Sequence, residues 1–222
     1  MKWQLLCMAL LPFLFCCKKD KGHSADKAVL TFSNVVILGN SITYAPANPS
    51  IGWNGNWGMA ASKPELDYVH ILESHFKVNN PKVVLSVKNI QPFEVDAAHY
   101  DFDAELKSLR DSHPDLVIIR IGENVSADVD LAMFEKRYAA LINYFKADNP
   151  NVIVLSGGSI WGSVIDNVMA KHPPFILLKS IVNEGANFST GLFADAGVAA
   201  HPTDKGMQNI ASLIWDYIKT LK

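Results

Sequence analysis

The stretch VVILGNSIT, residues 35 to 43, decides the fold, because an unbroken aliphatic run ends there in small polar residues. Such a run predicts a strand that is buried on both faces, as in a parallel sheet covered by helices. In open α/β sheets the chemistry gathers at the carboxyl ends of the strands. Ser41 lies at such an end and is therefore a candidate nucleophile. The alternative is that Asn40 and Ser41 only cap a helix or shape a turn.

Further aliphatic runs alternate with helical patterns along the chain. Strands are expected at 83–87, 115–122, 152–155 and 175–178, and helices at 60–76, 101–111, 131–145, 163–170 and 207–221. This alternation predicts a three-layer α/β/α domain with a mostly parallel five-stranded sheet and right-handed crossovers.

Length and charge limit the classes of protein that fit the sequence. The 222 residues are 49% hydrophobic and 19% charged, enough to bury the core of one globular domain. The net charge of -2 provides no basic surface. We therefore expect no binding to nucleic acid.

The first residues have the form of an export signal. Lys2 precedes an apolar run that is too short to span a membrane and is interrupted by Pro12. Leu14-Phe15-Cys16-Cys17 resembles a bacterial lipobox, so we expect a signal peptide at 1–16 and a lipidated, flexible tether at 17–32, anchored through Cys17. The folded domain would then comprise 33–222 and lie at the bacterial cell envelope, on the outer membrane or cell surface. Cleavage before Cys16 and an ordinary secretory signal are the alternatives.

All three cysteines, Cys7, Cys16 and Cys17, lie in this leader. The domain itself therefore has no disulfide, no cysteine nucleophile and no thiolate metal site. His70 and His75 are five residues apart on an expected helix, an offset that does not bring two ligands onto one metal. We expect neither a metal nor another cofactor.

The loop after Ser41 is rich in proline and glycine and contains Trp53 and Trp57. Their indole rings either stack on a sugar or roof an acyl pocket, or they pack the loop onto the domain.

Two later segments complete a set of polar residues at strand ends. Asn124 follows the strand expected at 115–122, and His201-Pro202 precedes the last helix. Together with Ser41, this order resembles the SGNH (GDSL-like) hydrolases over about residues 33 to 222. The resemblance implies a flavodoxin-like sheet of order 2-1-3-4-5 and serine-dependent ester hydrolysis. His201 would accept the proton of Ser41, while the Ser41 N–H and the Asn124 side chain would hold the oxyanion.

The first two blocks of that family are altered here. Asn40 stands where the family usually has aspartate. The second block lacks the glycine whose N–H binds the oxyanion in the family, and Pro92 has no N–H to donate. The amide of Gln91 or Phe93 would have to take that role.

The acid that orients the histidine is also missing from its usual place. Val198 stands three residues before His201, where the family has aspartate. We expect Asp195 to reach the ring instead, with Glu94, Glu123 or a backbone carbonyl as alternatives.

The expected function is hydrolysis of short acyl esters, above all acetyl groups on carbohydrates. The substrate would be a small-molecule or glycan ester, and the membrane would be contacted through the lipid anchor. A lipase or lysophospholipase-like esterase, and a carbohydrate-binding lipoprotein without catalysis, are the alternatives.

Overall fold

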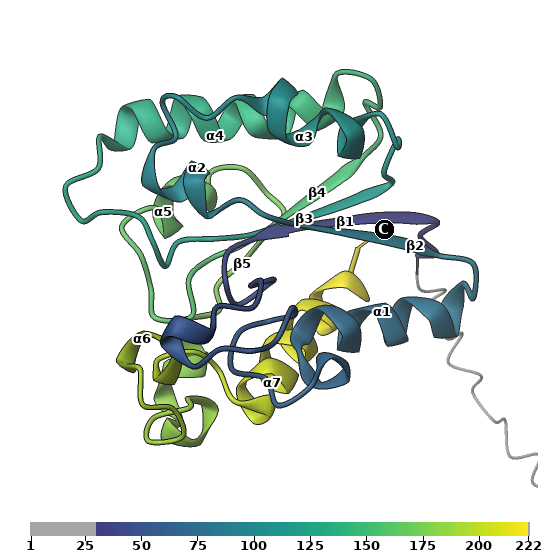
Figure 1. Ribbon diagram of the computed structural model, residues 1–222. Helices are drawn as coiled ribbons and strands as arrows, with labels where there is room; N and C mark the ends of the chain where they lie inside the picture. The colour runs from purple at the N-terminus through teal and green to yellow at the C-terminus, as the bar shows by residue number, and fades with distance from the viewer. Residues whose placement is uncertain (1–29, 222) are drawn as a thin grey trace, which may run out of the picture.

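The computed structural model describes residues 30–221, which form three layers with a parallel sheet in the middle (Figure 1). The strands are β1 (Asn34–Gly39), β2 (Val84–Asn89), β3 (Leu116–Arg120), β4 (Ile153–Gly157) and β5 (Phe175–Ile176). The α-helices are α1 (Tyr68–Asn79), α2 (Gln91–Val95), α3 (Phe102–Arg110), α4 (Leu131–Lys146), α5 (Asp166–Met169), α6 (Ala196–Ala199) and α7 (Asp204–Ile218). Short 3₁₀ turns occur at Pro49–Ile51, Pro64–Leu66, Lys179–Asn183 and Gly185–Asn187.

The sheet has the order β2-β1-β3-β4-β5 and all its pairings are parallel. This confirms the predicted flavodoxin-like α/β fold. Strand β1 lies between β2 and β3, with Val36 level with Ser86 on one side and Val117 on the other. The aliphatic side chains of β1 are fully buried, as expected for a strand covered on both faces.

Helices α1 and α7 cover one face of the sheet, and α3 and α4 cover the other (Figure 1). Alternate residues of β1 therefore enter different cores: Val35 and Ile37 pack with α1 and α7, whereas Val36 and Leu38 pack with α4. All five strands point their carboxyl ends to the same edge, where α5 and α6 lie. The loops at this edge carry the polar residues singled out by the sequence.

Several elements differ from the sequence-based expectations. The helix expected from residue 60 begins only at Tyr68, because the Asp67 side chain accepts a hydrogen bond from the N–H of His70 and caps the helix there. Helices α2 and α6 form within segments that were expected to be loops. The expected signal peptide and most of the tether lie outside the described residues. Within 30–221, no helix is both long and apolar enough to cross a membrane.

Candidate active site

Ser41 and His201 lie 160 residues apart in sequence and meet at the carboxyl edge of the sheet. The Oγ of Ser41 is 2.7 Å from Nε2 of His201. Ser41 stands in a tight turn directly after β1, in which the N–H groups of Thr43 and Tyr44 both donate to the carbonyl of Asn40. The turn leaves no space at Gly39, where a Cβ would lie 1.9 Å from the Thr43 hydroxyl. The pairing of a serine hydroxyl with an imidazole is the arrangement of an activated nucleophile.

The ring of His201 is oriented by a backbone carbonyl. Its Nδ1 lies 2.7 Å from the carbonyl oxygen of Gly197, in α6. A carbonyl only accepts hydrogen bonds, so Nδ1 carries the proton and Nε2 is free to accept the proton of Ser41. Burial lowers the pKa of His201, which favours the neutral ring that a general base requires.

Asp195 does not occupy the position expected for the acid of a triad. Its carboxylate accepts a hydrogen bond from the N–H of Val198 and caps α6. The expected contact with Nδ1 of His201 is therefore wrong, because the carbonyl of Gly197 takes that place. Val198, at the family's aspartate position, is fully buried and packs against the loop after β1. Of the alternatives considered, the backbone carbonyl is the one that the structure shows.

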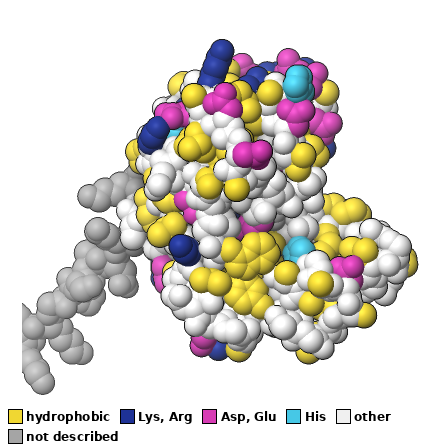
Figure 2. Space-filling model, turned by 90° about the vertical axis from the view of Figure 1, so that its left-hand side faces the viewer, with side chains coloured by type: hydrophobic (Ala, Val, Ile, Leu, Met, Phe, Trp, Pro, Cys, Tyr) yellow, Lys and Arg dark blue, Asp and Glu magenta, His cyan; other side chains and the backbone are white. Residues whose placement is uncertain are grey.

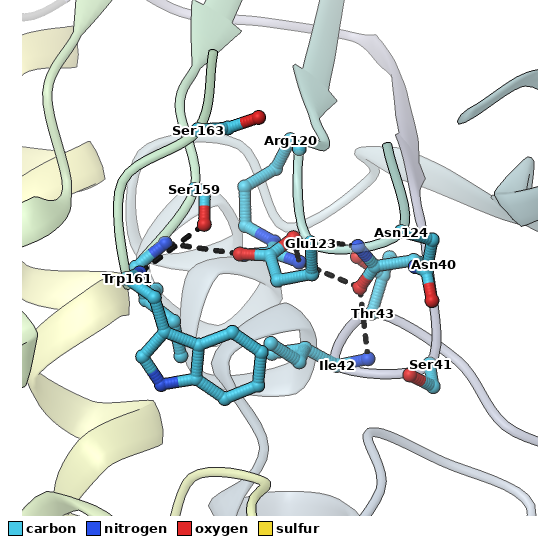
Figure 3. A network of polar contacts seen from close by, with 12 residues as sticks. Asn40, Ser41, Ile42, Thr43, Arg120, Glu123, Asn124, Ser159, Trp161 and Ser163 are labelled. Carbon is cyan, nitrogen blue, oxygen red and sulfur yellow. Dashed lines mark hydrogen bonds and ion pairs between the residues drawn. The ribbon is translucent and has the colours of Figure 1, made fainter. Parts of the chain in front are cut away.

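Asn40, beside the candidate nucleophile, is fully buried and uses both ends of its amide (Figure 3). Its Nδ2 donates to Glu94 at 3.1 Å and to Glu123 at 2.6 Å. Its Oδ1 accepts from Arg120 at 2.6 Å and from the N–H of Ile42 at 3.2 Å. Asparagine rather than aspartate fits this position, because two carboxylates face its amino group.

Arg120 and Glu123 form an ion pair beneath the site. Two guanidinium nitrogens lie 2.8 and 2.9 Å from the two oxygens of Glu123, and the Arg120 side chain is fully buried. Burial alone would raise the pKa of Glu123, but the charge and hydrogen bonds of Arg120 outweigh it and hold this pKa below its usual value. Glu123 also accepts from the N–H of Ile160, which ties the loop after β4 to the pair.

Asn124 lies at the same edge, and its side chain is held by Glu94. Nδ2 of Asn124 donates to Oε2 of Glu94 at 2.7 Å. Glu94 is nearly fully buried, and this burial, together with the nearby charge of Glu123, raises its pKa. Neither Glu94 nor Glu123 has a hydrogen bond to His201 among the described residues, so both are removed from the candidates for the acid partner.

The backbone amides expected to replace the missing glycine donor are already used. The N–H of Gln91 donates to the Asn89 side chain at 2.8 Å, and that of Phe93 donates to the carbonyl of Ile90. The expectation for either amide is therefore wrong, because both close the first turn of α2. Among the described residues, the N–H of Ser41 has no protein acceptor, so it remains available to an oxyanion.

A hollow of about 300 Å³ opens beside the candidate nucleophile. Its wall contains Ser41 and Asn124 together with apolar and amide side chains: Ala45, Pro46, Asn48, Ile51, Met59, Asn89 and Gln91. A second hollow, lined by Tyr44, Val87, Lys88 and Pro92, shares Pro46, Asn89 and Gln91 with the first. The two adjoin and continue the site over the β2 edge of the sheet.

The tryptophans considered as a sugar platform pack the loop instead. Trp53 is buried and Trp57 partly buried, and their rings meet edge to face at 5.5 Å. Each indole N–H donates to a backbone carbonyl, of Ala45 and Ala61 respectively. Of the two alternatives left open by the sequence, packing is therefore the one that the structure supports.

A different aromatic pair, of which one ring is exposed, lies near His201. Trp161, in the loop after β4, is 37% exposed and stacks on Phe188 at 6.1 Å. Phe188 pairs with Pro202, the residue after His201. Figure 2, which looks toward the carboxyl edge of the sheet, shows hydrophobic side chains gathered at the middle of this face beside a histidine. A single tryptophan in a glycine- and serine-rich segment offered no periodic signal that would have identified it.

Comparisons with known proteins place this geometry in a structural context. No family model and no curated protein matches the sequence. Solved structures do match: a two-domain esterase active on acetylated mannans has 20% identity and a TM-score of 0.54 over 86% of this chain, which spans 50% of that chain. This chain thus covers half the length of that esterase.

Two shorter proteins are matched over nearly their whole length. A protein from Bacteroides uniformis described as a GDSL-like lipase has 16% identity and a TM-score of 0.54, covering 85% of this chain and 96% of that chain. A carbohydrate esterase family 3 protein from Talaromyces cellulolyticus also has 16% identity and a TM-score of 0.54, covering 86% and 100%. The chain is therefore structurally similar to SGNH and GDSL-like esterases and has the fold of the SGNH hydrolases.

Proposed function

We propose that this protein is a serine-dependent ester hydrolase that removes short acyl groups, above all acetyl, from carbohydrates. The observation that carries the proposal is the 2.7 Å contact between Ser41 Oγ and His201 Nε2. Asn124 lines the same hollow as the serine, so an oxyanion donor stands beside the nucleophile.

The geometry supports a two-step acyl transfer. Ser41 Oγ attacks the ester carbon while its proton passes to His201 Nε2, and the carbonyl π electrons move to the oxygen. The Ser41 N–H and the Asn124 Nδ2 stabilise that oxyanion. When the intermediate collapses, the bond to the alcohol oxygen breaks and His201 returns the proton to it. Water then attacks the acyl-serine with the same proton transfers, which releases the acid and restores the hydroxyl.

The acyl group would occupy the hollow beside Ser41. A tetrahedral intermediate directs its oxyanion toward Asn124 and its leaving oxygen toward His201, so the acyl carbon chain takes the remaining direction. Ala45 and Met59 offer apolar contact close to the serine, whereas Asn89 and Gln91 line the continuation. Each further methylene would gain its roughly 0.8 kcal/mol only against an apolar wall.

The alcohol would lie on the His201 side, because His201 protonates it. Trp161 offers the exposed ring on that side, and sugar rings stack readily on aromatic faces. Trp161→Ala should raise KM for an acetylated oligosaccharide while leaving hydrolysis of methyl acetate nearly unchanged, because a methyl leaving group has no ring that could stack on the indole. An equal loss with both substrates would contradict this placement of the sugar.

The reaction itself is tested by covalent labelling. A fluorophosphonate probe should modify Ser41, as identified by mass spectrometry, and Ser41→Ala should not be labelled. A nitrophenyl ester series should peak at acetate and fall with chain length. Activity that rises steadily to eight or more carbons would favour the lipase alternative. A folded protein that is not labelled by the probe and hydrolyses no ester would favour the carbohydrate-binding lipoprotein without catalysis.

We also propose that the protein acts at the cell envelope, tethered through a lipid on Cys17. The support is the lipobox-like sequence before Cys17, which lies outside the described residues. Cys17→Ser should leave hydrolysis intact and move the protein from the membrane fraction to the soluble one. Unchanged membrane association of this variant would argue against the anchor.

A further inference from the structure

Glu94 is a nearly fully buried carboxylate that no step of the proposed reaction uses, yet it accepts hydrogen bonds from both loops around the oxyanion site. From the loop after β3, it accepts the N–H of Gly122 at 2.5 Å, the N–H of Asn124 at 3.4 Å and Nδ2 of Asn124 at 2.7 Å. From the loop after β1, it accepts Nδ2 of Asn40 at 3.1 Å. One side chain on α2 thus joins the segments that carry the two expected oxyanion donors.

We propose that Glu94 is the positioning residue of the oxyanion hole: by accepting one N–H of the Asn124 amide, it directs the other toward the oxyanion. This inference rests on the proposed ester hydrolysis and adds a role to it. Glu94 itself does not touch the substrate.

The physical reason is the ambiguity of an amide side chain. An asparagine amide rotated by 180° presents its carbonyl oxygen where its amino group stood, and a carbonyl facing an oxyanion is repulsive. A carboxylate beside Nδ2 accepts only from the amino group, so it selects the donating orientation. Glu94 also accepts the backbone N–H groups of Gly122 and Asn124, which holds their loop in place. Movement of the loop would leave the buried carboxylate without these donors, which costs free energy.

The surroundings of Glu94 act on its ionisation in opposite directions. The positive charge of Arg120, at the end of β3, favours the ionised carboxylate of Glu94. Burial and the charge of Glu123 oppose ionisation, and they raise the pKa of Glu94. The hydrogen bonds from Gly122 and Asn124 favour the ionised form. The hydrogen bonds from Gly122 and Asn124 therefore stabilise the ionised carboxylate of Glu94, and the carboxylate in turn holds the loop that donates them.

This arrangement also accounts for the altered second block. The backbone amides of Gln91 and Phe93 are engaged within α2 and cannot replace the missing glycine donor. Instead of a donor to the oxyanion, α2 contributes a hydrogen-bond acceptor. This acceptor is the Glu94 carboxylate, which orients the Asn124 amide in the loop after β3.

The test is a double-mutant cycle with Glu94→Gln and Asn124→Ala. A glutamine keeps the size of the side chain but turns an amino group toward groups that donate. Glu94→Gln should lower kcat for nitrophenyl acetate by about 10- to 100-fold with little change in KM, since removal of one preorganised donor costs about 10²-fold or more. In the Asn124→Ala background the same change should lower kcat by less than about threefold, because residues that act as a unit are not additive.

A matched control is Glu105→Gln on α3, an exposed carboxylate paired with Lys88, which should leave kcat unchanged. If Glu94→Gln is folded and keeps wild-type kcat, or if its effect is additive with Asn124→Ala, the inference is wrong.

A second measurement keeps this result separate from failure of the proposed function. In nitrogen-15 NMR spectra, the hydrogen bond to Glu94 should give one side-chain N–H of Asn124 a displaced and slowly exchanging signal that Glu94→Gln removes. If the wild type hydrolyses no ester and Ser41 is not labelled, the proposed function fails. The hydrogen bond by which Glu94 holds the Asn124 amide is then still supported by loss of that signal in the variant, and overturned by an Asn124 signal that is the same in both proteins.

Discussion

Buried charged and amide side chains hold the Ser41 side of the site, whereas one turn of backbone holds the His201 side. Asn40 and Arg120, beneath Ser41, are both fully buried. Nδ1 of His201 donates its hydrogen bond to the carbonyl of Gly197 in the four-residue helix α6. The Ser41 side is therefore stabilised by charge pairing between buried side chains, whereas the His201 ring is positioned by the backbone of α6.

Because of this difference, substitutions on the Ser41 side should mainly reduce stability, and substitutions on the His201 side should mainly reduce activity. Removing one partner from a buried ionic network leaves another buried charge uncompensated, which lowers the stability of the whole domain. Changing an exposed position in the short helix α6 affects mainly the orientation of the group that the helix carries. Four substitutions or titrations can separate these outcomes.

The largest effect is expected from His201→Ala. It removes the proton acceptor of Ser41, so kcat should fall by about 10⁴-fold or more, while the free energy of unfolding changes little because the ring is partly exposed. Ester hydrolysis and urea unfolding measure the two quantities. His99→Ala, at an exposed histidine paired with Asp96, is the control and should alter neither. If the free energy of unfolding fell by as much as the activation free energy of hydrolysis rose, His201 would also stabilise the domain, and the contrast between the two sides would be wrong.

Asn40→Asp should act mainly on stability, although it restores the residue usual in the SGNH family. The new carboxylate would face Glu94 and Glu123 in place of an amino group that donates to both. We expect the free energy of unfolding to fall by about 1–3 kcal/mol from the lost hydrogen bonds alone. Urea unfolding followed by circular dichroism measures it. An Asn40→Asp variant as stable as the wild type would show that the network rearranges freely.

Asp195→Ala should have a small effect, because the residue caps α6 and does not contact His201. Loss of the cap should reduce stability by about 1 kcal/mol. The expected decrease in kcat is only several-fold, against about 10⁴-fold when the acid of a Ser-His-Asp triad is replaced. Asp130→Ala, which removes the cap of α4, should cost similar stability without any change in kcat. A 10⁴-fold decrease for Asp195→Ala would restore it as the acid partner.

The smallest effect concerns pH. Burial lowers the pKa of His201 from its ordinary value of 6.5, whereas the hydrogen bond to the Asp67 carboxylate raises the pKa of His70 on α1. Since only the neutral His201 accepts a proton, kcat/KM should decline only as the pH falls below 6.5. NMR titration should place the two histidines on opposite sides of that value. A His201 that titrates above it would indicate a carboxylate partner.

The sequence predicted the sheet and much of the candidate site, for physical reasons that differ from residue to residue. The positions and burial of the strands followed from aliphatic runs, whereas the order of the sheet came from the resemblance to the SGNH hydrolases. Ser41, Asn124 and His201 stood out because polar residues follow strand ends or precede a helix, and because their order matches that family. The structure brings Ser41 and His201 together. The Gly197 carbonyl left no trace in the sequence, since every residue has one.

Other residues were missed although a signal existed. Arg120 interrupts an aliphatic strand, and a charge at a buried position requires a partner nearby, which Glu123 supplies three residues later. Glu94 was considered only as an alternative acid partner of His201, and its buried role was harder to predict, because a glutamate in an expected loop is usually exposed. Its burial depends on α2, a helix of five residues that hydrophobic periodicity does not detect.

The carbonyl of Gly197 changes what evolution can alter around His201. A carboxylate is lost by a single substitution, but a main-chain oxygen survives every substitution at its position. A Cβ at Gly197 would lie 3.0 Å from the Asp195 oxygen that caps α6, so replacement by alanine would require only that this carboxylate shift by a few tenths of an ångström. The count of residues between Gly197 and His201 is constrained instead, because deletion or insertion there would turn the ring away from its acceptor. Within this segment, selection would act on length more strongly than on residue identity.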